Sequence, residues 1–544
     1  MQSLWITRPA NVLGLKTIVY IGLVSLLYKL NAQDKNFQEE VHLSLNTTNI
    51  LVGETLHFSA FIYSNESKRM SNLSSVLYIE LIDKGGRSMF QTKIGLRGGR
   101  GAGSIYIRPE WMTDTYRIIA YTRWMKNYES YFEQKVLIFN PYNGVIINDT
   151  ISGNPHKWQE HLARDTETYK PIENVTIDLG SIEPAKLAIG VRRATNLYYP
   201  NEVKLKNQRV DIDSYQILPE YRYAVIQGKI IKESGDPGQI RINMIIKGSS
   251  LQLATTKTDE FGRFCMNYNP DYLIRDGMVQ IEVKDETAKS ISLIDEYYDH
   301  YPMLSDYFTL DSAIIPELID RSVFSQIERA YEIIPSIEPA RQTNYTHPQA
   351  LVLFLDEYTR FSSTRDTFIE LTSNVSVSKN ENNYSLTVRC KHLPNIISEK
   401  PESLLLLDGF KTTAENILNQ SPNNIEKIEI LPQYYFVNDI VYGGIISVHS
   451  FTSKKFEYTP SGQTFSLGDY QSYSESDYKL EIEENLPLYD FNLLWKPIYT
   501  HEGGTLRLNL TTSRLEGNYL ISVTGITQSG TPINLLQYFQ ISSN

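Results

Sequence analysis

The sequence has few of the residues that build disulfide frameworks, nucleic-acid interfaces or membrane helices. Its two cysteines, Cys265 and Cys390, lie 125 positions apart, which indicates two small buried residues and leaves open at most a single bridge. The net charge of −11 and the pI of about 5.5 argue against the basic face of a nucleic-acid binder. After the N-terminal segment no run approaches about 18 apolar residues, which excludes a helical membrane protein.

Motifs for catalysis, cofactors and metals are also missing. The sequence has no nucleophile elbow and no phosphate-binding P-loop, and neither cysteine lies in a thioester motif. HKWQEH (His156–His161) has one residue too many for a zinc helix and is interpreted as a loop. GGRGAG (Gly98–Gly103) lies between expected strands and indicates a hairpin turn. DEYYDH (Asp295–His300) favours a solvated interdomain loop over a metal site. We therefore predict no catalytic, cofactor-binding or metal residues.

The N-terminus is typical of a secretory signal. Arg8 and Lys16 precede an apolar run of about 12 residues, Thr17–Tyr28, and polar residues follow. This layout predicts a signal peptide over residues 1–32 and export to the periplasm or the outer membrane. An uncleaved membrane anchor is the alternative, although the run is short for a span.

Residues 33–141 alternate between apolar and polar positions, with turn signals between the runs. The pattern predicts six strands, from HLSLN at His42 to KVLIFN at Lys135, and hence a β-sandwich. ILVGETLHF, YIELIDKGG, GAGSIYI and DTYRIIAYTRWMKN together resemble the MG2-type domain of macroglobulins. The positions that carry this resemblance are Gly53, Glu54, Tyr116, Arg117 and Tyr121.

Two further β regions follow. ENVTIDLG and LAIGVRRA are the strand candidates of residues 142–222, interpreted as a degenerate second macroglobulin-like domain. Residues 223–293 are similar to the carboxypeptidase-regulatory-like sandwich, a module without peptidase chemistry. Its pattern is carried by Gly228, Asp259, Gly262 and Phe264. Asp259 and Gly262 predict a tight turn, after which Phe264 should enter the core.

Helix-like spacing in residues 294–349 predicts a helical linker, and residues 350–450 then alternate strands and short helices. LLLLDGF, AENILNQ, IEKIEIL and GGIISVHS resemble the plug domain of TonB-dependent receptors. The positions that match that family are Asp408, Gly409, Pro422, Ile425, Glu426, Ile428, Gly443 and Gly444. The stretch QYYFVNDIVYGG departs from the family pattern at the plug apex.

Residues 451–544 alternate again and predict a C-terminal β-sandwich. The 94 residues after Ser450 would barely supply the eight strands of the smallest outer-membrane barrel. We therefore expect a plug-like module without a barrel, and fold alone does not imply transport.

The expected fold class is mainly β and multidomain, with serial macroglobulin-like and Ig-like β-sandwiches plus one α/β plug-like domain. This order resembles envelope proteins of Bacteroidetes-type bacteria. It implies a non-enzymatic accessory or scaffold, peripheral to the membrane, that binds an outer-membrane or periplasmic protein such as a β-barrel transporter. The alternative is a surface binder of glycans or host proteins, with Trp111, Trp124 and Tyr121 as an aromatic platform unless they are core residues. A hydrolase is a remote third hypothesis.

Overall fold

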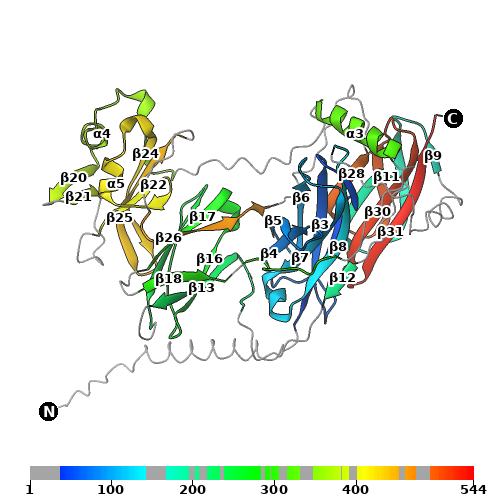
Figure 1. The fold of residues 1–544 in the computed structure, drawn as a ribbon, viewed down its shortest axis with the longest axis horizontal. Coiled ribbons are helices and arrows are strands. Elements are labelled where there is room, and N and C mark those ends of the chain that lie inside the picture. The colour runs from blue at the N-terminus through cyan, green and yellow to red at the C-terminus, as the bar shows by residue number, and fades with distance from the viewer. Residues whose placement is uncertain are drawn as a thin grey trace, which may run out of the picture.

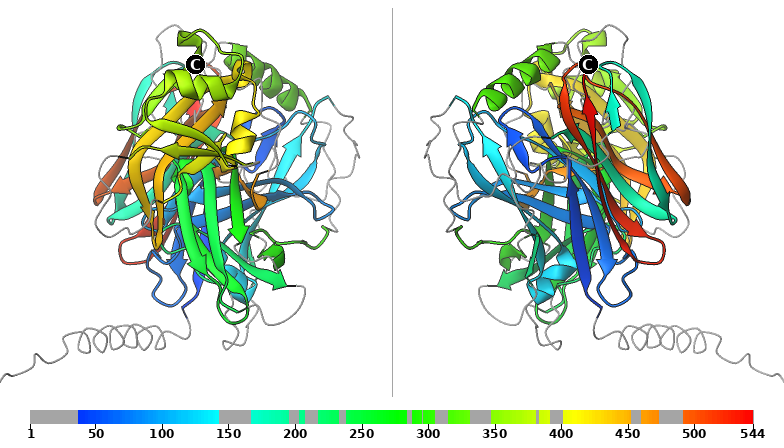
Figure 2. Two further views of the ribbon diagram at one scale, coloured as in Figure 1. Left: turned by 90° about the vertical axis from the view of Figure 1, so that its left-hand side faces the viewer. Right: turned by 90° about the vertical axis from the view of Figure 1, so that its right-hand side faces the viewer.

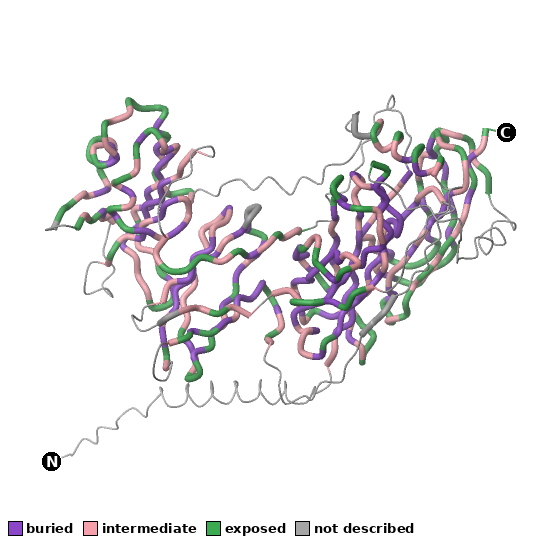
Figure 3. The backbone as a smooth tube through the Cα atoms, in the orientation of Figure 1, coloured by how far each residue is buried: buried purple, intermediate pink, exposed green. Residues whose placement is uncertain are grey.

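The chain folds into several β-rich units joined side by side (Figure 1). The fold class is mainly β with more than one domain, as the sequence predicts. The computed structural model describes residues 37–142, 167–194, 203–206, 217–232, 238–283, 288–294, 296–304, 315–330, 347–380, 383–390, 401–451, 460–472 and 491–543. Buried residues run through the middle of each unit (Figure 3). None of the helices in these residues is long and apolar enough to cross a membrane.

The first sandwich contains the strands predicted for residues 33–141. One sheet has the order β1-β3-β6, and β4, β5, β7 and β8 lie in the facing sheet, to which β2 adds in parallel through β8. The short helix η1 (Arg123–Tyr128) connects β7 to β8. The strands are β1 (Glu39–Leu45), β2 (Asn49–Leu51), β3 (Thr55–Ser64), β4 (Val76–Ile82), β5 (Ser88–Gly95), β6 (Arg100–Tyr106), β7 (Asp114–Thr122) and β8 (Tyr131–Phe139).

The second sandwich corrects a prediction. Strand β11 pairs with β28 on one side and β30 on the other, and β10 pairs with β29, so residues 142–222 and 451–544 do not form separate domains. Strands β10 and β11 each need partners within a sheet and a second sheet to cover their apolar faces. Strands that lie about 300 positions later in the sequence supply these partners. The strands are β9 (Glu167–Tyr169), β10 (Asn174–Ile182), β11 (Ala185–Arg193), β28 (Asn492–His501), β29 (Gly504–Thr511), β30 (Gly517–Thr527) and β31 (Pro532–Ile541).

The third sandwich occupies the region with the regulatory-like pattern and gains one strand from later in the chain. Its sheets have the orders β16-β13-β18 and β15-β14-β17-β26. The short helix η4 (Pro270–Tyr272) precedes β17. The strands are β13 (Ala224–Lys232), β14 (Arg241–Gly248), β15 (Gln252–Lys257), β16 (Arg263–Tyr268), β17 (Leu273–Val283), β18 (Ala288–Leu293) and β26 (Gln463–Gly468).

The α/β unit has a five-stranded mixed sheet of order β19-β24-β25-β22-β23. Helices α4 and α5 and the hairpin β20–β21 share a core with one face of this sheet. Its elements are β19 (Leu351–Phe354), η6 (Leu355–Glu357), α4 (Thr364–Leu371), β20 (Val375–Asn380), β21 (Asn383–Val388), β22 (Leu404–Leu407), β23 (Phe410–Lys411), α5 (Ala414–Leu418), η7 (Pro422–Asn424), β24 (Ile425–Val437) and β25 (Ile440–Ser450).

The chain crosses repeatedly between units. Strands β12 (Val203–Lys206) and β27 (Tyr470–Gln471) both extend the β4-containing sheet of the first sandwich. Helix α3 (Ile315–Ala330) lies in the predicted linker but is docked, because the Arg321 guanidinium donates to both Glu54 carboxylate oxygens at 2.9 and 2.6 Å. Figures 1 and 2 show α3 beside the first two sandwiches, at the end of the molecule opposite the α/β unit.

Candidate functional site

A cavity of about 650 Å³ lies between the α/β unit and the third sandwich. This volume falls within the usual range for sites that take small ligands, which often form where two domains meet. One wall consists of the sheet face that α4 and α5 leave uncovered, and the other contains the β14–β15 turn. The lining residues that matter below are Lys247, Ser250, Phe410, Lys427, Glu429 and His449.

The sheet face that forms the cavity wall changes character along its strands. At one end Leu404, Leu431 and Ile445 pack with Ile245 of β14 and join the two units. Two residues further along β24 and β25 the same face carries Glu429 beside Ser447, and two further Lys427 beside His449. Because residues two apart in a strand lie on the same face of the sheet, these four polar residues continue the face that is apolar at its other end. The apolar half holds the joint closed and the polar half faces the cavity.

The polar half is a compact hydrogen-bonded cluster. Glu429 lies 2.5 Å from the Lys427 ammonium and 3.7 Å from His449 Nε2, and Ser447 Oγ lies 3.0 Å from the same nitrogen. Burial alone would raise the pKa of Glu429, but hydrogen bonds from His449 and Lys427 outweigh it and lower the pKa to about 2. Glu429 is therefore a fixed anion that holds the other two side chains in place.

Ser447, His449 and Glu429 are the residue types of a hydrolytic triad, but their geometry differs from one. A triad uses both imidazole nitrogens, one toward the nucleophile and the other toward the acid. Here Ser447 and Glu429 both face Nε2 of His449. Ser447 also lies within strand β25, where the ladder with β24 occupies the backbone and no N–H pair is set aside for an oxyanion. The arrangement fits binding better than acyl transfer.

An open strand edge borders this cavity. β19 is the terminal strand of its sheet and pairs only with β24 among the described residues. Val352 lies opposite Glu429 and Phe354 opposite Lys427, so both share the cavity face. Leu351 and Phe354 are 39% and 44% exposed. A further strand laid along β19 would therefore run beside the cavity.

This edge lacks the features that usually protect edge strands from pairing, which are charged residues, proline and bulges. The sequence of β19 is LVLF. Every other strand at the edge of a described sheet contains at least one polar or charged residue, such as Lys257 in β15, Lys411 in β23 and Glu167 in β9. The large apolar side chains of Tyr358, just after η6, and Phe436, near the end of β24, are also exposed.

The plug-like positions shape this site. Asp408 and Gly409, with φ of +49° and +84°, form a tight turn between β22 and β23, as an Asp-Gly pair favours. The Asp408 carboxylate accepts hydrogen bonds from the Ser450 amide and hydroxyl, both at 2.8 Å. Asp408, Gly409 and Glu426 line the cavity.

The remaining plug-like positions are structural. Ile425 and Ile428 are buried in the helix-covered core, and Pro422 begins η7. A Cβ at Gly443 would lie 2.4 Å from the Pro401 carbonyl oxygen, and one at Gly444 would lie 2.5 Å from Val388 Cβ.

The regulatory-like positions also have structural roles. The Asp259 side chain accepts backbone hydrogen bonds from Phe261 and Arg263 at 3.0 and 2.8 Å, and Gly262 has φ of +77°. The expected tight turn is therefore confirmed. Phe264 is 3% exposed and packs against Gly228, where a Cβ would lie 2.8 Å from its ring.

The macroglobulin-like positions lie in the first sandwich and its contacts. Gly53 turns the chain with φ of +87°, and Glu54 binds Arg321 as described above. Tyr116 donates to the Met112 carbonyl at 3.0 Å, and buried Arg117 donates to the Pro302 carbonyl at 2.5 Å. Tyr121 donates to Glu80 at 2.8 Å. None of these five residues lines the cavity.

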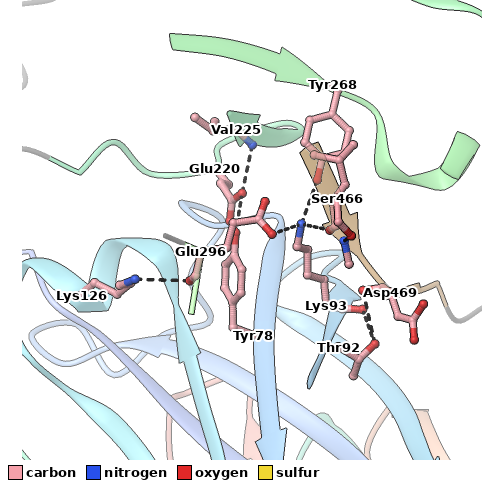
Figure 4. A network of polar contacts seen from close by, with 12 residues as sticks. Tyr78, Thr92, Lys93, Lys126, Glu220, Val225, Tyr268, Glu296, Ser466 and Asp469 are labelled. Atoms are coloured by element: carbon pink, nitrogen blue, oxygen red, sulfur yellow. Dashed lines mark hydrogen bonds and ion pairs between the residues drawn. The ribbon is translucent and has the colours of Figure 1, made fainter. Parts of the chain in front are cut away.

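A second cluster of ionisable groups lies where the first and third sandwiches meet (Figure 4). The buried Lys93 ammonium contacts the Glu296 carboxylate and the Leu467 carbonyl, each at 2.6 Å, and the Tyr268 hydroxyl at 3.0 Å. Tyr78 donates to Glu220 at 3.0 Å. Lys93 of the first sandwich thus bonds to Tyr268 and Leu467 of the third, so this cluster holds the units together.

That cluster corrects the reading of DEYYDH as a solvated loop. Tyr297 and Tyr298 of this stretch pack edge-on against Tyr78 and Tyr121, and Glu296 is the partner of Lys93. The stretch does connect domains, but tyrosines that bury their rings in the joint exclude water from it. Asp295 is outside the described residues, and no metal-binding group of His, Cys, Asp and Glu occurs in the described part of the chain.

The proposed aromatic platform is contradicted. Trp111 is 4% exposed, Tyr121 is fully buried, and Trp124 packs against the same core while donating to the Phe37 carbonyl at 3.0 Å. They are core residues of the first sandwich, the reading that the sequence also allowed. Within GGRGAG, Gly98 and Gly99 form a tight turn with φ of +60° and +73°, but it leads from one sheet to the facing one.

Other sequence features have simpler outcomes. Cys265 and Cys390 are both half-buried and are not joined in a disulfide. HKWQEH and the predicted signal peptide lie outside the described residues. The Lys427–Glu429–His449 cluster was missed, although the alternation of KIEIL against IISVH places these polar residues on one sheet face and could have indicated it.

Comparisons with known proteins leave the family open. No protein-family model and no curated protein matches the chain. Solved structures similar to it include a Salmonella alpha-2-macroglobulin reacted with methylamine, at 7% identity and a TM-score of 0.25, covering 93% of this chain and 39% of that one. An Escherichia coli alpha-2-macroglobulin activated by porcine elastase matches at 7% identity and a TM-score of 0.26, with 93% and 44% covered. The chain spans about two fifths of the length of these proteins.

Proposed function

We propose that the chain is a non-enzymatic, exported cell-envelope protein that binds a partner protein by adding one of its strands to β19. The observation that carries this proposal is the unprotected LVLF edge with Leu351 and Phe354 exposed. Strand addition gains affinity from backbone hydrogen bonds and specificity from side-chain pockets beside the edge. The cavity on the same face offers such a pocket.

The partner class follows from the expected export. A periplasmic or outer-membrane protein, such as a β-barrel transporter or a secretion component, is the expected partner. A scaffold role is supported by the interlocked sandwiches, which hold the α/β unit at one end of the molecule (Figure 1). Glycan or host-protein binding through Trp111 and Tyr121 loses its support, since both are buried.

The test combines site-specific crosslinking with affinity purification of the tagged chain at native level from solubilised envelopes. A photoreactive phenylalanine at position 354 should crosslink one protein in near-equal amount, while the same group at Leu536, exposed on β31, should not. Leu351→Lys with Phe354→Lys should reduce recovery of that protein about tenfold or more, since charges at an edge oppose pairing. Leu536→Lys is the matched control.

The outcomes separate the parts of the proposal. Equal recovery with the double lysine variant would rule out the β19 edge as the binding element. Recovery of the chain alone in every variant would contradict the scaffold function. Cell fractionation with N-terminal sequencing tests export and cleavage near residue 32, and protease treatment of intact cells distinguishes surface display from the periplasm.

A further inference from the structure

We propose that the cavity between the α/β unit and the third sandwich is a binding site for a zwitterionic ligand of short-peptide size, with an ammonium group at one end and a carboxylate at the other. Two lining side chains of opposite charge, Glu426 and Lys247, carry this assignment. The proposal does not depend on strand addition at β19, because neither residue belongs to that strand.

Glu426 is the carboxylate that receives the ammonium group of the ligand. It is half-buried and is the extra residue of a bulge in β24, because the register with β25 shifts between Ile425 and Lys427. Bulges re-aim a side chain and often occur beside functional sites. The neighbouring Lys427 is already paired with Glu429 at 2.5 Å, and Glu426 itself has no ion pair in the described part of the chain.

Lys247 is the ammonium that receives the carboxylate of the ligand. It is half-buried on β14 and lies over the Asp408–Gly409 turn, where a Cβ added to Gly409 would lie 3.2 Å from Lys247 Cγ. Its Nζ lies 5.6 Å from the centre of the Phe410 ring, a contact that uses the positive charge but none of the three N–H donors. The Asp408 carboxylate accepts from Ser450 instead, so Lys247 has no ion pair among the described residues.

The spacing of the two side chains fits a ligand of about three residues. In the sheet order β19-β24-β25-β22-β23, strand β25 separates Glu426 on β24 from the β22–β23 turn beneath Lys247. Two inter-strand spacings amount to about 10 Å, which is roughly the length of an extended tripeptide. The cavity volume of about 650 Å³ is sufficient for such a molecule.

Ligands with one kind of charge, or with none, fit the lining less well. An anion would meet the carboxylates of Asp408, Glu426 and Glu429 against two lysines. A cation would leave Lys247 without a counter-ion, and a neutral ligand would leave both Lys247 and Glu426 without one. Because opposite charges attract more strongly where water is excluded, a zwitterion gains the most from filling the cavity. The excess of carboxylates predicts that the ligand's ammonium group contributes more than its carboxylate.

The experiment is calorimetric titration of the full chain at pH 7 with four ligands that differ only at their ends. Trialanine carries both charges, trialanine amide only the cation, N-acetyl-trialanine only the anion, and N-acetyl-trialanine amide neither. Most free amino termini are protonated at this pH, because their pKa is about 7.7–8.0. Trialanine should bind one-to-one, about tenfold tighter than the amide and more tightly still than the acetylated ligand. Binding of trialanine no tighter than that of either singly capped ligand, or no saturable binding, would overturn the proposal.

Two charge-removing variants assign the contacts. Glu426→Gln should bind trialanine and N-acetyl-trialanine within about threefold of each other, because the ammonium group then has no carboxylate to meet. Lys247→Gln should do the same for trialanine and its amide. The matched controls are Glu415→Gln on α5 and Lys379→Gln on β20, both exposed, and Lys379 also lies over an aromatic ring. Both controls should keep the native differences, and the same differences in the two cavity variants would refute the assignment.

A third variant tests the location without removing a charge. Ser250→Trp fills the cavity from the β14–β15 turn and should abolish trialanine binding. Ser385→Trp, on the exposed face of the β20–β21 hairpin, is its control and should bind as the native chain does. Unchanged binding in Ser250→Trp would place trialanine elsewhere and contradict the proposal.

Discussion

Glu220 gives the sharpest test of how the joints are built. It is fully buried between the first and third sandwiches, and its Oε1 accepts hydrogen bonds from Tyr78 and from the Val225 amide, both at 3.0 Å (Figure 4). Burial raises the pKa of Glu220 from 4.5 to about 7, against the lowering influence of Arg123. The folded chain therefore keeps a proton on Glu220 at pH values where the unfolded chain has lost it.

The sign and size of the effect follow from proton linkage. Between pH 4.5 and 7 the native state binds one more proton than the unfolded state, so the free energy of unfolding falls by about 1.4 kcal/mol per pH unit. The contribution of Glu220 is fully present below pH 4.5, is lost as the pH rises to 7, and is constant above. The total loss is about 3 kcal/mol.

Two half-buried histidines act in the opposite direction and would mask this slope in the native protein alone. Desolvation lowers the pKa of His42, and that of His57 to about 4. Their contribution is present above pH 6.5 and is lost as the pH falls toward 4. The useful quantity is therefore the difference between the native chain and Glu220→Gln, in which both histidines cancel.

The assay is urea unfolding of the mature chain from pH 4.5 to 8, followed by tryptophan fluorescence, to which Trp111 and Trp124 of the first sandwich and Trp495 of the second contribute. Relative to Glu220→Gln, the native chain should lose about 3 kcal/mol between the ends of this range. The amide keeps the oxygen that Tyr78 and Val225 contact. Glu260→Gln, an exposed carboxylate of the third sandwich, is the control. A difference between native and Glu220→Gln that stays constant with pH would refute the reasoning.

Two further predictions concern glycine and the buried ion pair. Gly444→Ala should destabilise the α/β unit by roughly 2 kcal/mol or more in thermal unfolding, because φ is +89° and the new Cβ meets Val388. The control is Gly180→Ala, which should cost only about 1 kcal/mol, because φ is +85° there but no atom lies within 4 Å of the new Cβ. Equal losses of stability in the two variants would contradict the steric argument. Lys93→Met should cost about 3–5 kcal/mol by leaving Glu296 unpaired. Lys93→Met with Glu296→Gln should recover part of that loss in the same unfolding assay, and no recovery would show that the pair contributes little.

Local patterns in the sequence predict most individual elements. Alternation places strands within residues 33–141 and 350–450 close to where they occur. The turns at Asp259–Gly262 and Asp408–Gly409 follow from residues that tolerate positive φ. These features depend on neighbours a few positions apart, so a short window of sequence contains the information.

Pairings between distant segments could not be predicted in this way. From Asn174 to Gly180, β10 alternates between exposed and buried positions, which shows that it has one apolar face but not which strand covers it. All seven residues of β4 are buried, because its outer face, with Tyr78 and Glu80, meets the tyrosines of residues 297–301. These covering residues lie more than 200 positions from β4 in the sequence. The local alternation of apolar and polar residues therefore cannot predict that the outer face of β4 is buried.

The way the units share strands bears on the binding proposals. The first sandwich takes β12 and β27 from elsewhere, the second is assembled from two distant segments, and the third takes β26. The α/β unit differs, since its sheet consists only of strands from residues 351–450. The chain enters it after α3 and returns to β26 of the third sandwich, so the unit is an insertion that no other described sheet needs for completion. Changes at β19 can therefore test partner binding while the interlocked sandwiches stay folded, which makes loss of a partner attributable to the edge.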